Sequence, residues 1–118
     1  MFEKLKNRGV IPVIAVETTD QALQVAEALQ KGDLPVAEIT FRTEAADAAI
    51  RNIRQRYPEM TVGAGTILSV DQLKQAIDAR AHFGVAPGFS RDLTAAAIEA
   101  DFPFAPGVCT PTDVSGAT

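Results

Sequence analysis

The chain alternates short apolar runs with segments of helical periodicity, and this alternation constrains the fold more than any other feature. Each run is too short for a helix and is bounded by glycine or proline, which is typical of a buried strand. The runs start about 20 to 25 residues apart, a spacing that predicts right-handed βαβ units and a parallel α/β sheet. They occupy residues 11–16, 36–41, 61–67, 83–85 and 102–108.

The segments between the runs carry helix signals. Each has apolar residues at helical spacing, and each begins after a hydroxyl side chain that can accept a hydrogen bond from an orphan backbone N–H. Gln21 and Gln72 follow three residues after two of these hydroxyls and complete the capping-box pattern. The expected N-caps are Thr18, Thr43, Ser69 and Ser90.

Two residues predict where helices end. Gly32 suits the left-handed conformation that follows a helix, and Pro58 ends the second helix after Tyr57. A further short helix is expected at about residues 1–8. Residues 1–118 are therefore expected to form a single domain, either a small open sheet or the first part of a barrel.

Composition excludes several classes of function. The net charge is -4 and the basic residues are scattered, which argues against nucleic acid and an anionic membrane surface as partners. Cys109 and His82 are the only residues of their types, so neither a disulfide nor a metal site is expected. No apolar run approaches the roughly 20 residues of a membrane span, and residues 1–8 lack a signal peptide's apolar stretch. We expect a cytoplasmic protein without cofactor.

Strand 36–41 carries the most unusual polar residues. Glu38, Thr40 and Arg42 alternate with apolar residues and so share one face. An acid within a buried parallel strand is costly unless it is paired, and its pKa normally rises, as a general base near neutral pH requires. Two interpretations stay open: Glu38 is the carboxylate of a functional site, or it forms an internal ion pair with Arg42.

Other strand ends carry weaker signals. Gly63, Gly65 and Thr66 offer close backbone approach and a hydroxyl, although barrel glycines often only relieve crowding. A dinucleotide-binding fingerprint is discounted because no third glycine follows in place. Pro87 and Pro106, each followed by glycine, are typical of sharp strand exits.

These segments together resemble a known family. The carrying motifs are Pro12-Val13-Ile14, Glu38-Ile39-Thr40-Phe41-Arg42-Thr43, Gly63-Ala64-Gly65-Thr66, Val85-Ala86-Pro87-Gly88 and Pro106-Gly107-Val108. In this order and spacing they resemble the 2-keto-3-deoxy-6-phosphogluconate (KDPG) aldolases, which also act as 4-hydroxy-2-oxoglutarate (KHG) aldolases. The resemblance implies a TIM-type (β/α) barrel, of which this chain holds about five β/α units of eight.

The resemblance also implies a chemistry. Family members are metal-free class I aldolases, usually homotrimers, that form an imine between a lysine and a keto acid and release pyruvate and an aldehyde. By resemblance, Glu38 is the catalytic acid/base, while Arg42 and Thr66 bind the pyruvate carboxylate and Pro87 shapes the pocket rim. The Schiff-base lysine belongs to the sixth strand and the phosphate site to the last two, so we expect neither in this chain.

Two residues of this chain depart from the family pattern. Asp33 stands where a second glycine is expected, and Arg80 where a glycine usually ends the third helix. A left-handed Arg80 would cost about 1 kcal/mol. The lysines present (Lys4, Lys6, Lys31 and Lys74) are expected to be solvated surface cations.

Alternatives to an aldolase are a non-catalytic half-barrel that oligomerises or binds keto acids and, less favoured, another phosphate-binding barrel enzyme. Because a partial barrel has unpaired strand edges and an uncovered apolar interior, we expect the chain either to associate with itself or to be the ordered part of a longer product.

Overall fold

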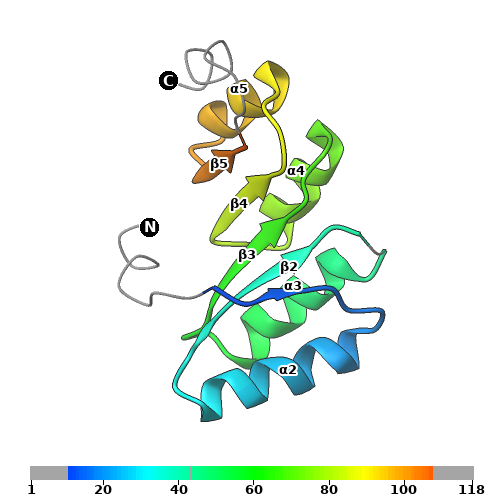
Figure 1. Cartoon of the computed structure of the whole chain (residues 1–118), viewed down its shortest axis with the longest axis vertical. Helices are drawn as coiled ribbons and strands as arrows, with labels where there is room; N and C mark the ends of the chain where they lie inside the picture. The colour runs from blue at the N-terminus through cyan, green and yellow to red at the C-terminus, as the bar shows by residue number, and fades with distance from the viewer. Residues whose placement is uncertain (1–10, 43, 108–118) are drawn as a thin grey trace.

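A parallel sheet with its strands in sequence order organises the molecule (Figure 1). The computed structural model describes residues 11–42 and 44–107. The sheet order is β1-β2-β3-β4-β5, and every pair is parallel. The strands are β1 Val13–Ile14, β2 Val36–Thr40, β3 Thr61–Gly65, β4 Phe83–Ala86 and β5 Phe104–Pro106. The helices are α2 Thr19–Lys31, α3 Ala46–Arg56, α4 Val70–Asp78 and α5 Arg91–Glu99.

The sequential strand order determines where the helices lie. A right-handed crossover between neighbouring parallel strands always returns on the same side, so all four helices cover one face of the sheet. In agreement, α2 packs on α3, α3 on α4, and α4 on α5. A doubly wound sheet would instead reverse its strand order and carry helices on both faces. The prediction of a partial (β/α) barrel is therefore confirmed.

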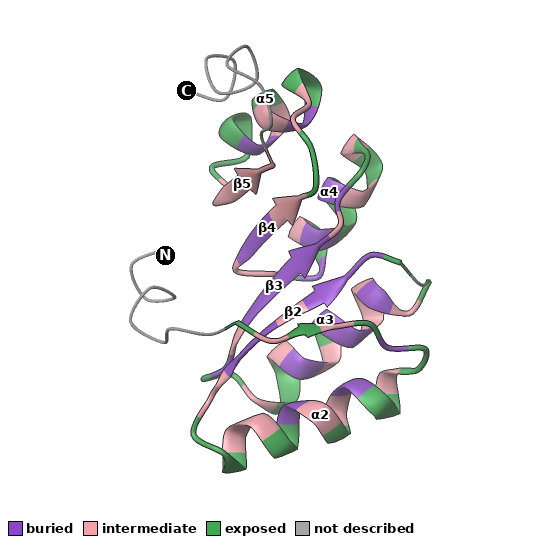
Figure 2. Ribbon diagram, viewed as in Figure 1, coloured by how far each residue is buried: buried purple, intermediate pink, exposed green. Residues whose placement is uncertain are grey.

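The main hydrophobic core lies between the sheet and the helices. Side chains alternate along the strands, so Ile39 and its register partner Ala64 point toward the helices and are buried. Ile50 and Ile53 of α3 and Leu73 of α4 meet them there with no more than 1% exposure. In Figure 2 the buried residues accordingly concentrate in β2, in β3 and on the sides of the helices that pack against the sheet.

The opposite sheet face, which we call the inner face, carries a second and smaller cluster. Glu38, Gly63 and Phe83 lie side by side in register on this face. The Phe83 ring lies over Gly63, occupying the space that a side chain on Gly63 would fill, and packs with buried Val36. The edge residue Val13 is paired with Glu38 in register and remains 64% exposed.

Three of the four predicted N-caps are confirmed. Thr18, Ser69 and Ser90 each accept a hydrogen bond from the backbone N–H three residues later, at 3.2–3.3 Å. The glutamine side chains of the two capping boxes reach one residue further back than the motif specifies, where they accept from the backbone N–H groups of Glu17 and Leu68.

The prediction that Thr43 caps α3 is wrong. The N-cap is Ala45, which makes no side-chain cap hydrogen bond, and Thr43 itself lies outside the described residues. The helix begins at Ala46, later than expected, and the described residues Glu44 and Ala45 that precede it form a turn. Pro58 is correctly placed, since α3 ends at Arg56 with Tyr57 as its C-cap.

Three helices end in a left-handed residue that is not glycine. Asp33, Arg80 and Asp101 have φ of 58°, 68° and 53°. Each is followed by an amide that donates to the carbonyl five residues earlier, which defines the Schellman motif. These bonds are Leu34 to Leu29, Ala81 to Ala76 and Phe102 to Ala97, at 2.9–3.0 Å.

The prediction for Gly32 is therefore wrong, and Arg80 does adopt the left-handed conformation whose cost is given above. Helix α2 continues to Lys31, so Gly32 becomes its C-cap with φ of −83°, and the left-handed position falls on Asp33.

Glycine at these three positions is expected to stabilise the fold. Asp33→Gly, Arg80→Gly and Asp101→Gly should each raise the free energy of unfolding by about 0.5–1 kcal/mol, because glycine carries no left-handed penalty. Chemical denaturation measures the change. Ala79→Gly is the control: Ala79 has φ of −76°, so glycine there should destabilise. Destabilisation by Arg80→Gly as large as that by Ala79→Gly would contradict the assignment.

Two further expectations concern a helix at residues 1–8 and a membrane span. The helix expected at 1–8 lies outside the described residues. Among those that are described, no helix is long and apolar enough to cross a membrane.

Candidate active site at the carboxyl ends of the strands

Backbone hydrogen bonds hold four strand exits together at one edge of the sheet. Phe41 N–H donates to the Gly65 carbonyl at 2.8 Å, and Ile67 N–H to that of Val85 at 3.2 Å. Gly107 N–H donates to the Ala86 carbonyl at 2.9 Å. Side chains that follow β2, β3 and β4 are thus positioned by a rigid frame, at the edge where α/β sheets bind ligands.

Glu38 lies on the inner face near this edge. Its carboxylate folds over Gly65, so closely that a side-chain carbon on Gly65 would overlap Glu38 Oε2 and come within 2.7 Å of its Cδ. Gly65 therefore makes the space that the carboxylate occupies. The side chain is half-buried, and desolvation of its charged form raises the pKa of the Glu38 carboxyl.

The raised pKa predicts how Glu38 affects stability. Below the pKa of an unfolded glutamate, about 4.3, the residue is protonated in both states and costs nothing. As the pH rises, the unfolded state loses its proton first, so the native state is progressively destabilised until the pH passes the folded pKa. Glu38→Gln should therefore be more stable than wild type at pH 7, an advantage that vanishes below about pH 4. Denaturant melts across this range test it, and an advantage independent of pH would contradict it.

The ion pair between Glu38 and Arg42 is not observed. Both residues are described, and within the described part of the chain the ion pair that forms is Lys31 with Glu27 on α2. Of the two interpretations of strand 36–41, the structure favours a carboxylate that is partly desolvated without a cationic partner.

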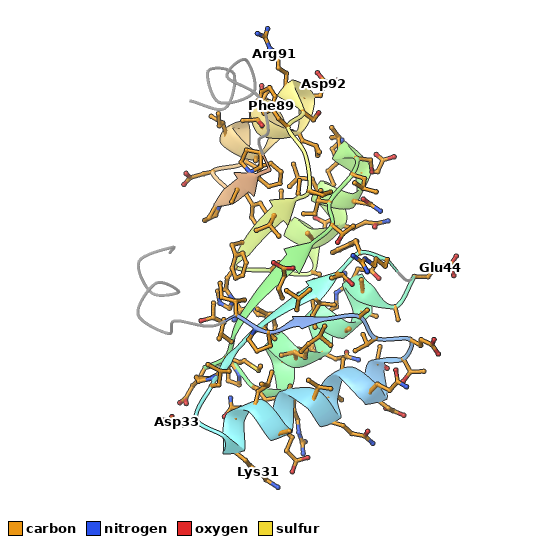
Figure 3. The ribbon with its side chains drawn as sticks, viewed as in Figure 1. Lys31, Asp33, Glu44, Phe89, Arg91 and Asp92 are labelled. Carbon is orange, nitrogen blue, oxygen red and sulfur yellow. The ribbon has the colours of Figure 1, made fainter. Side chains whose placement is uncertain are left out.

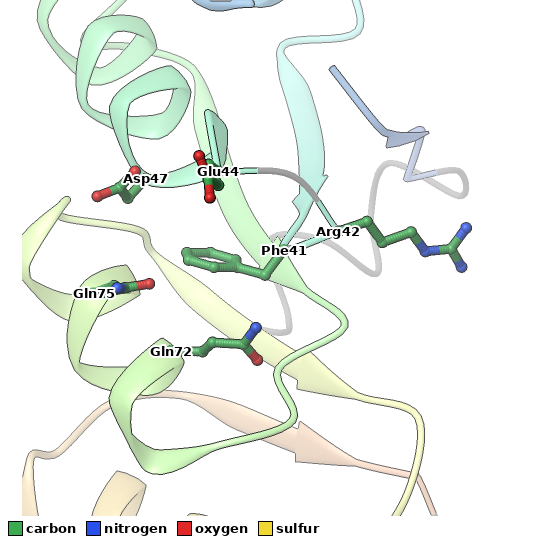
Figure 4. Close-up of a pocket in the computed structure, with 6 residues that line it drawn as sticks. All are labelled: Phe41, Arg42, Glu44, Asp47, Gln72 and Gln75. Atoms are coloured by element: carbon green, nitrogen blue, oxygen red, sulfur yellow. The ribbon is translucent and has the colours of Figure 1, made fainter. Parts of the chain in front are cut away.

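Arg42 leaves the end of β2 and is exposed. It borders a polar pocket of about 350 Å³ with Phe41, Glu44, Asp47, Gln72 and Gln75. Figure 4 shows that its side chain extends away from the other five, so its guanidinium is not directed into that pocket.

Thr66 has an unusual backbone conformation. It directly follows Gly65, the residue over which the Glu38 carboxylate folds, and its φ is 56°. A β-branched residue in the left-handed region is a genuine outlier that costs of order 1–3 kcal/mol. Such strain is common at functional sites, so Thr66 stays a candidate site residue.

Pro87 marks the exit of β4. A side chain on Gly107 would overlap the Pro87 carbonyl oxygen, so the β4 and β5 exits pass each other in close backbone contact. Pro87 is exposed at the rim of this edge. At this edge Glu38 lies against Gly65, which Thr66 follows directly in the chain, and Arg42 and Pro87 lie at neighbouring exits.

The described lysines do not approach this site. Lys31 pairs with Glu27 at 3.0 Å, with its side chain 75% exposed, and Figure 3 shows it pointing away from the body of the protein. Lys74 is exposed on α4. Lys4 and Lys6 lie outside the described residues. In the described ranges no group of three or more histidine, cysteine or acidic side chains could hold a metal ion.

Sequence reasoning missed two features of the site. The polar pocket brings residues of the β2–α3 connection to α4, and only Gln72 among its α4 residues carried a signal, as a capping residue. The close contact between Glu38 and Gly65 also went unnoticed, although the acid and the Gly-Ala-Gly segment were both visible. Their contact depends on strand register, which no local pattern reveals.

Comparison with known proteins points to one family. The family model described as KDPG and KHG aldolase matches residues 1–118. The 2-dehydro-3-deoxy-phosphogluconate aldolase of Haemophilus influenzae is 40% identical over 111 residues, which is 94% of this chain and 52% of that protein. The KHG/KDPG aldolase of Escherichia coli K12 is 44% identical over 101 residues, 86% of this chain and 47% of that protein. The chain thus spans about half the length of the curated relatives it matches.

Solved structures give the same result. A KDPG aldolase from Legionella pneumophila, crystallised with pyruvate captured at low pH as a covalent carbinolamine intermediate, matches with a TM-score of 0.85 at 34% identity. The match covers 91% of this chain and 52% of that one. The Zymomonas mobilis ZM4 aldolase with 3-phosphoglycerate matches with a TM-score of 0.82 at 40% identity, over 90% of this chain and 50% of that one.

Proposed function

Because the chain belongs to the family of KDPG and KHG aldolases, we propose that it forms the proton-transferring and carboxylate-binding side of a Schiff-base aldolase site. The substrates are KDPG or 4-hydroxy-2-oxoglutarate, and the products are pyruvate and an aldehyde. One observation carries the proposal: the half-buried Glu38 carboxylate lies against Gly65 at the ligand-binding edge of the sheet, with its pKa raised.

The groups that carry out the reaction come partly from this chain and partly from the remaining strands of a closed barrel. A lysine amine outside residues 1–118 attacks the keto group, and loss of water gives an imine. The electrons of the C3–C4 bond then move into the imine as the C4 hydroxyl loses its proton, and the aldehyde leaves. The resulting enamine takes a proton at C3, and water releases pyruvate and restores the amine. Each of these steps needs a proton carrier.

Glu38 supplies that carrier. Desolvation raises the pKa of the Glu38 carboxyl, and so brings it closer to the range in which a group can both accept and return a proton near neutral pH. Since the carboxylate has no ion-pair partner within the described residues, no neighbouring cation holds it in the deprotonated form.

Arg42 and Thr66 bind the substrate carboxylate. A guanidinium presents a planar fork that matches a carboxylate, and a hydroxyl adds a further donor. The two residues follow adjacent strands joined by the hydrogen bond from Phe41 to Gly65, so both reach the same edge. Pro87 contributes to the rim at the next exit.

Trapping with borohydride tests the proposal. Pyruvate and borohydride should add no mass to the 118-residue chain. A chimera in which residues 1–118 replace the matching half of a full-length family member should gain one reduced pyruvate, on a lysine outside residues 1–118. Intact-mass and peptide spectra locate the adduct. A chimera that folds but is not labelled would contradict the proposal.

A second candidate function is a non-catalytic half-barrel that associates or binds keto acids. The exposed Val13 at the β1 edge favours association. Failure of the folded chimera to trap pyruvate, together with weak pyruvate binding, would favour this candidate. The expected homotrimer and the cytoplasmic location also stay predictions.

Arg42→Ala should raise the Michaelis constant for the keto acid in that chimera. Loss of a charge-assisted contact costs about 1.5–3 kcal/mol of binding, or roughly tenfold to a hundredfold, with turnover much less changed. Steady-state kinetics measure both. Arg91→Ala is the control, because Arg91 points outward from the start of α5 (Figure 3). A fall in turnover with an unchanged Michaelis constant would contradict the assignment.

A further inference from the structure

Three arginines surround a second hollow, at the opposite end of the sheet from Glu38. This hollow, the arginine pocket, has a volume of about 570 Å³ and lies between the carboxyl ends of α3 and α4. Its lining residues are Arg51, Arg54, Gln55, Pro58, Asp78, Ala79 and Arg80. We propose that it binds a small phosphate-bearing anion, independently of the aldolase site.

Positive charge predominates in the lining of the arginine pocket. Arg51, Arg54 and Arg80 outnumber the single acid Asp78, and none of the three arginines forms an ion pair in the part of the chain that the structure describes. The chain as a whole has a net charge of -4, so it does not attract anions through its overall field. Three like charges around one hollow in an acidic protein favour a local anion site.

One hydrogen bond organises the arginine pocket. Arg54 Nε donates to the backbone carbonyl of Arg80 at 2.8 Å, which ties α3 to the end of α4. The bond fixes the guanidinium plane of Arg54 and leaves its terminal N–H groups available to a ligand. Arg51 lies three residues earlier on the same helix and so shares this face.

Backbone strain at Arg80 is a second, independent observation. Of the three left-handed residues that end helices, Asp33 and Asp101 are of a type that tolerates this conformation, whereas Arg80 is not. Glycine would fit the turn better, so an arginine at a φ of 68° indicates a use for its side chain. That side chain lines the arginine pocket.

Compensation of helix dipoles accounts for only part of the cluster. Cations stabilise a helix only within its last turn. Arg54 and Arg56 meet that condition, but Arg51 lies five residues before the end of α3 at Arg56. Arg56 lines a different hollow, beside Asp20 and Tyr57.

The chemistry of the lining selects phosphate. Several guanidinium groups around one hollow match a phosphate dianion, whose oxygens accept paired hydrogen bonds from more than one side. A volume of about 570 Å³ suits a small metabolite. Most of the lining residues are polar or charged, and only Pro58 and Ala79 are apolar, so the lining favours a small polar anion over a larger organic group.

Isothermal titration of the 118-residue chain with inorganic pyrophosphate tests this proposal. We expect saturable one-to-one binding, weakened about tenfold or more by Arg51→Gln. The matched control Arg56→Gln makes the same charge change on the same helix and should alter the affinity less than about twofold. Amide NMR shifts should change at residues 51–58 and 78–80. Arg80→Gly should weaken binding while raising the melting temperature of the free chain.

Several results would overturn the proposal. These are absence of saturable binding, equal weakening by Arg51→Gln and Arg56→Gln, and shifts confined to other residues. Citrate binding as tightly as pyrophosphate would overturn the choice of phosphate. Should Arg51→Gln fail to fold, Arg80→Gly decides, because its fold is expected to be reinforced.

Discussion

Glu38→Gln is expected to reduce aldol cleavage by about 10²–10⁴-fold in a full-length chimera that carries residues 1–118. Glutamine has nearly the size of glutamate and fits over Gly65, but it cannot carry a proton between the hydroxyl, the imine and the C3 carbon. Steady-state cleavage assays measure the loss. Because the carboxylate is desolvated in the native state, the variant should lose activity while gaining stability at neutral pH.

The matched control for this change is Glu44→Gln. Glu44 lies at the polar pocket beyond the β2 exit, and its side chain is exposed (Figure 3). It carries the same charge a few residues away, so a general effect of charge would appear in both variants. Equal losses in both, or a loss in Glu38→Gln that follows unfolding, would contradict the role of Glu38.

Gly63→Ala is expected to destabilise the fold by about 1–3 kcal/mol. A methyl group on Gly63 would overlap the Phe83 ring, which is 1% exposed and packed against Val36, so the ring has little room to move. Denaturant unfolding measures the cost. The result reports on the inner face, because the overlap exists only if Gly63 and Phe83 are register partners.

Two other glycines calibrate this result. A methyl group on Gly88 would meet nothing within 4 Å, so Gly88→Ala should leave stability nearly unchanged. At Gly65 the methyl group would displace the end of the flexible Glu38 side chain, so Gly65→Ala should reduce activity more than stability. Equal destabilisation by Gly63→Ala and Gly88→Ala would contradict the register.

Local signals predicted the elements well. Thr18, Ser69 and Ser90 were identifiable as N-caps because their hydroxyls act on the first turn of their own helix. The five apolar runs located every strand within a few residues, since a buried parallel strand has few polar positions. Family resemblance then gave the barrel, which the sequential strand order confirms.

Features that depend on contacts between elements were not predictable. Nothing in the sequence shows that Phe83 covers Gly63 or that Glu38 folds over Gly65, because both contacts follow from register between strands about 20 residues apart. The end of α2 was misjudged by one residue, which moved the left-handed position from Gly32 to Asp33. Helix ends depend on where tertiary packing stops the helix, and residue type biases them only weakly.

Exchange of the pyruvate methyl protons with solvent tests the central claim most directly, because it follows proton transfer at C3 without requiring aldol cleavage. In deuterated buffer, the chimera carrying residues 1–118 should replace the methyl protons at a rate that NMR can follow. With Glu38→Gln the exchange should fall by about 10²–10⁴-fold, while borohydride still traps pyruvate on the chimera. Exchange at the wild-type rate in the Glu38→Gln chimera would show that another group moves the proton, and would contradict the account.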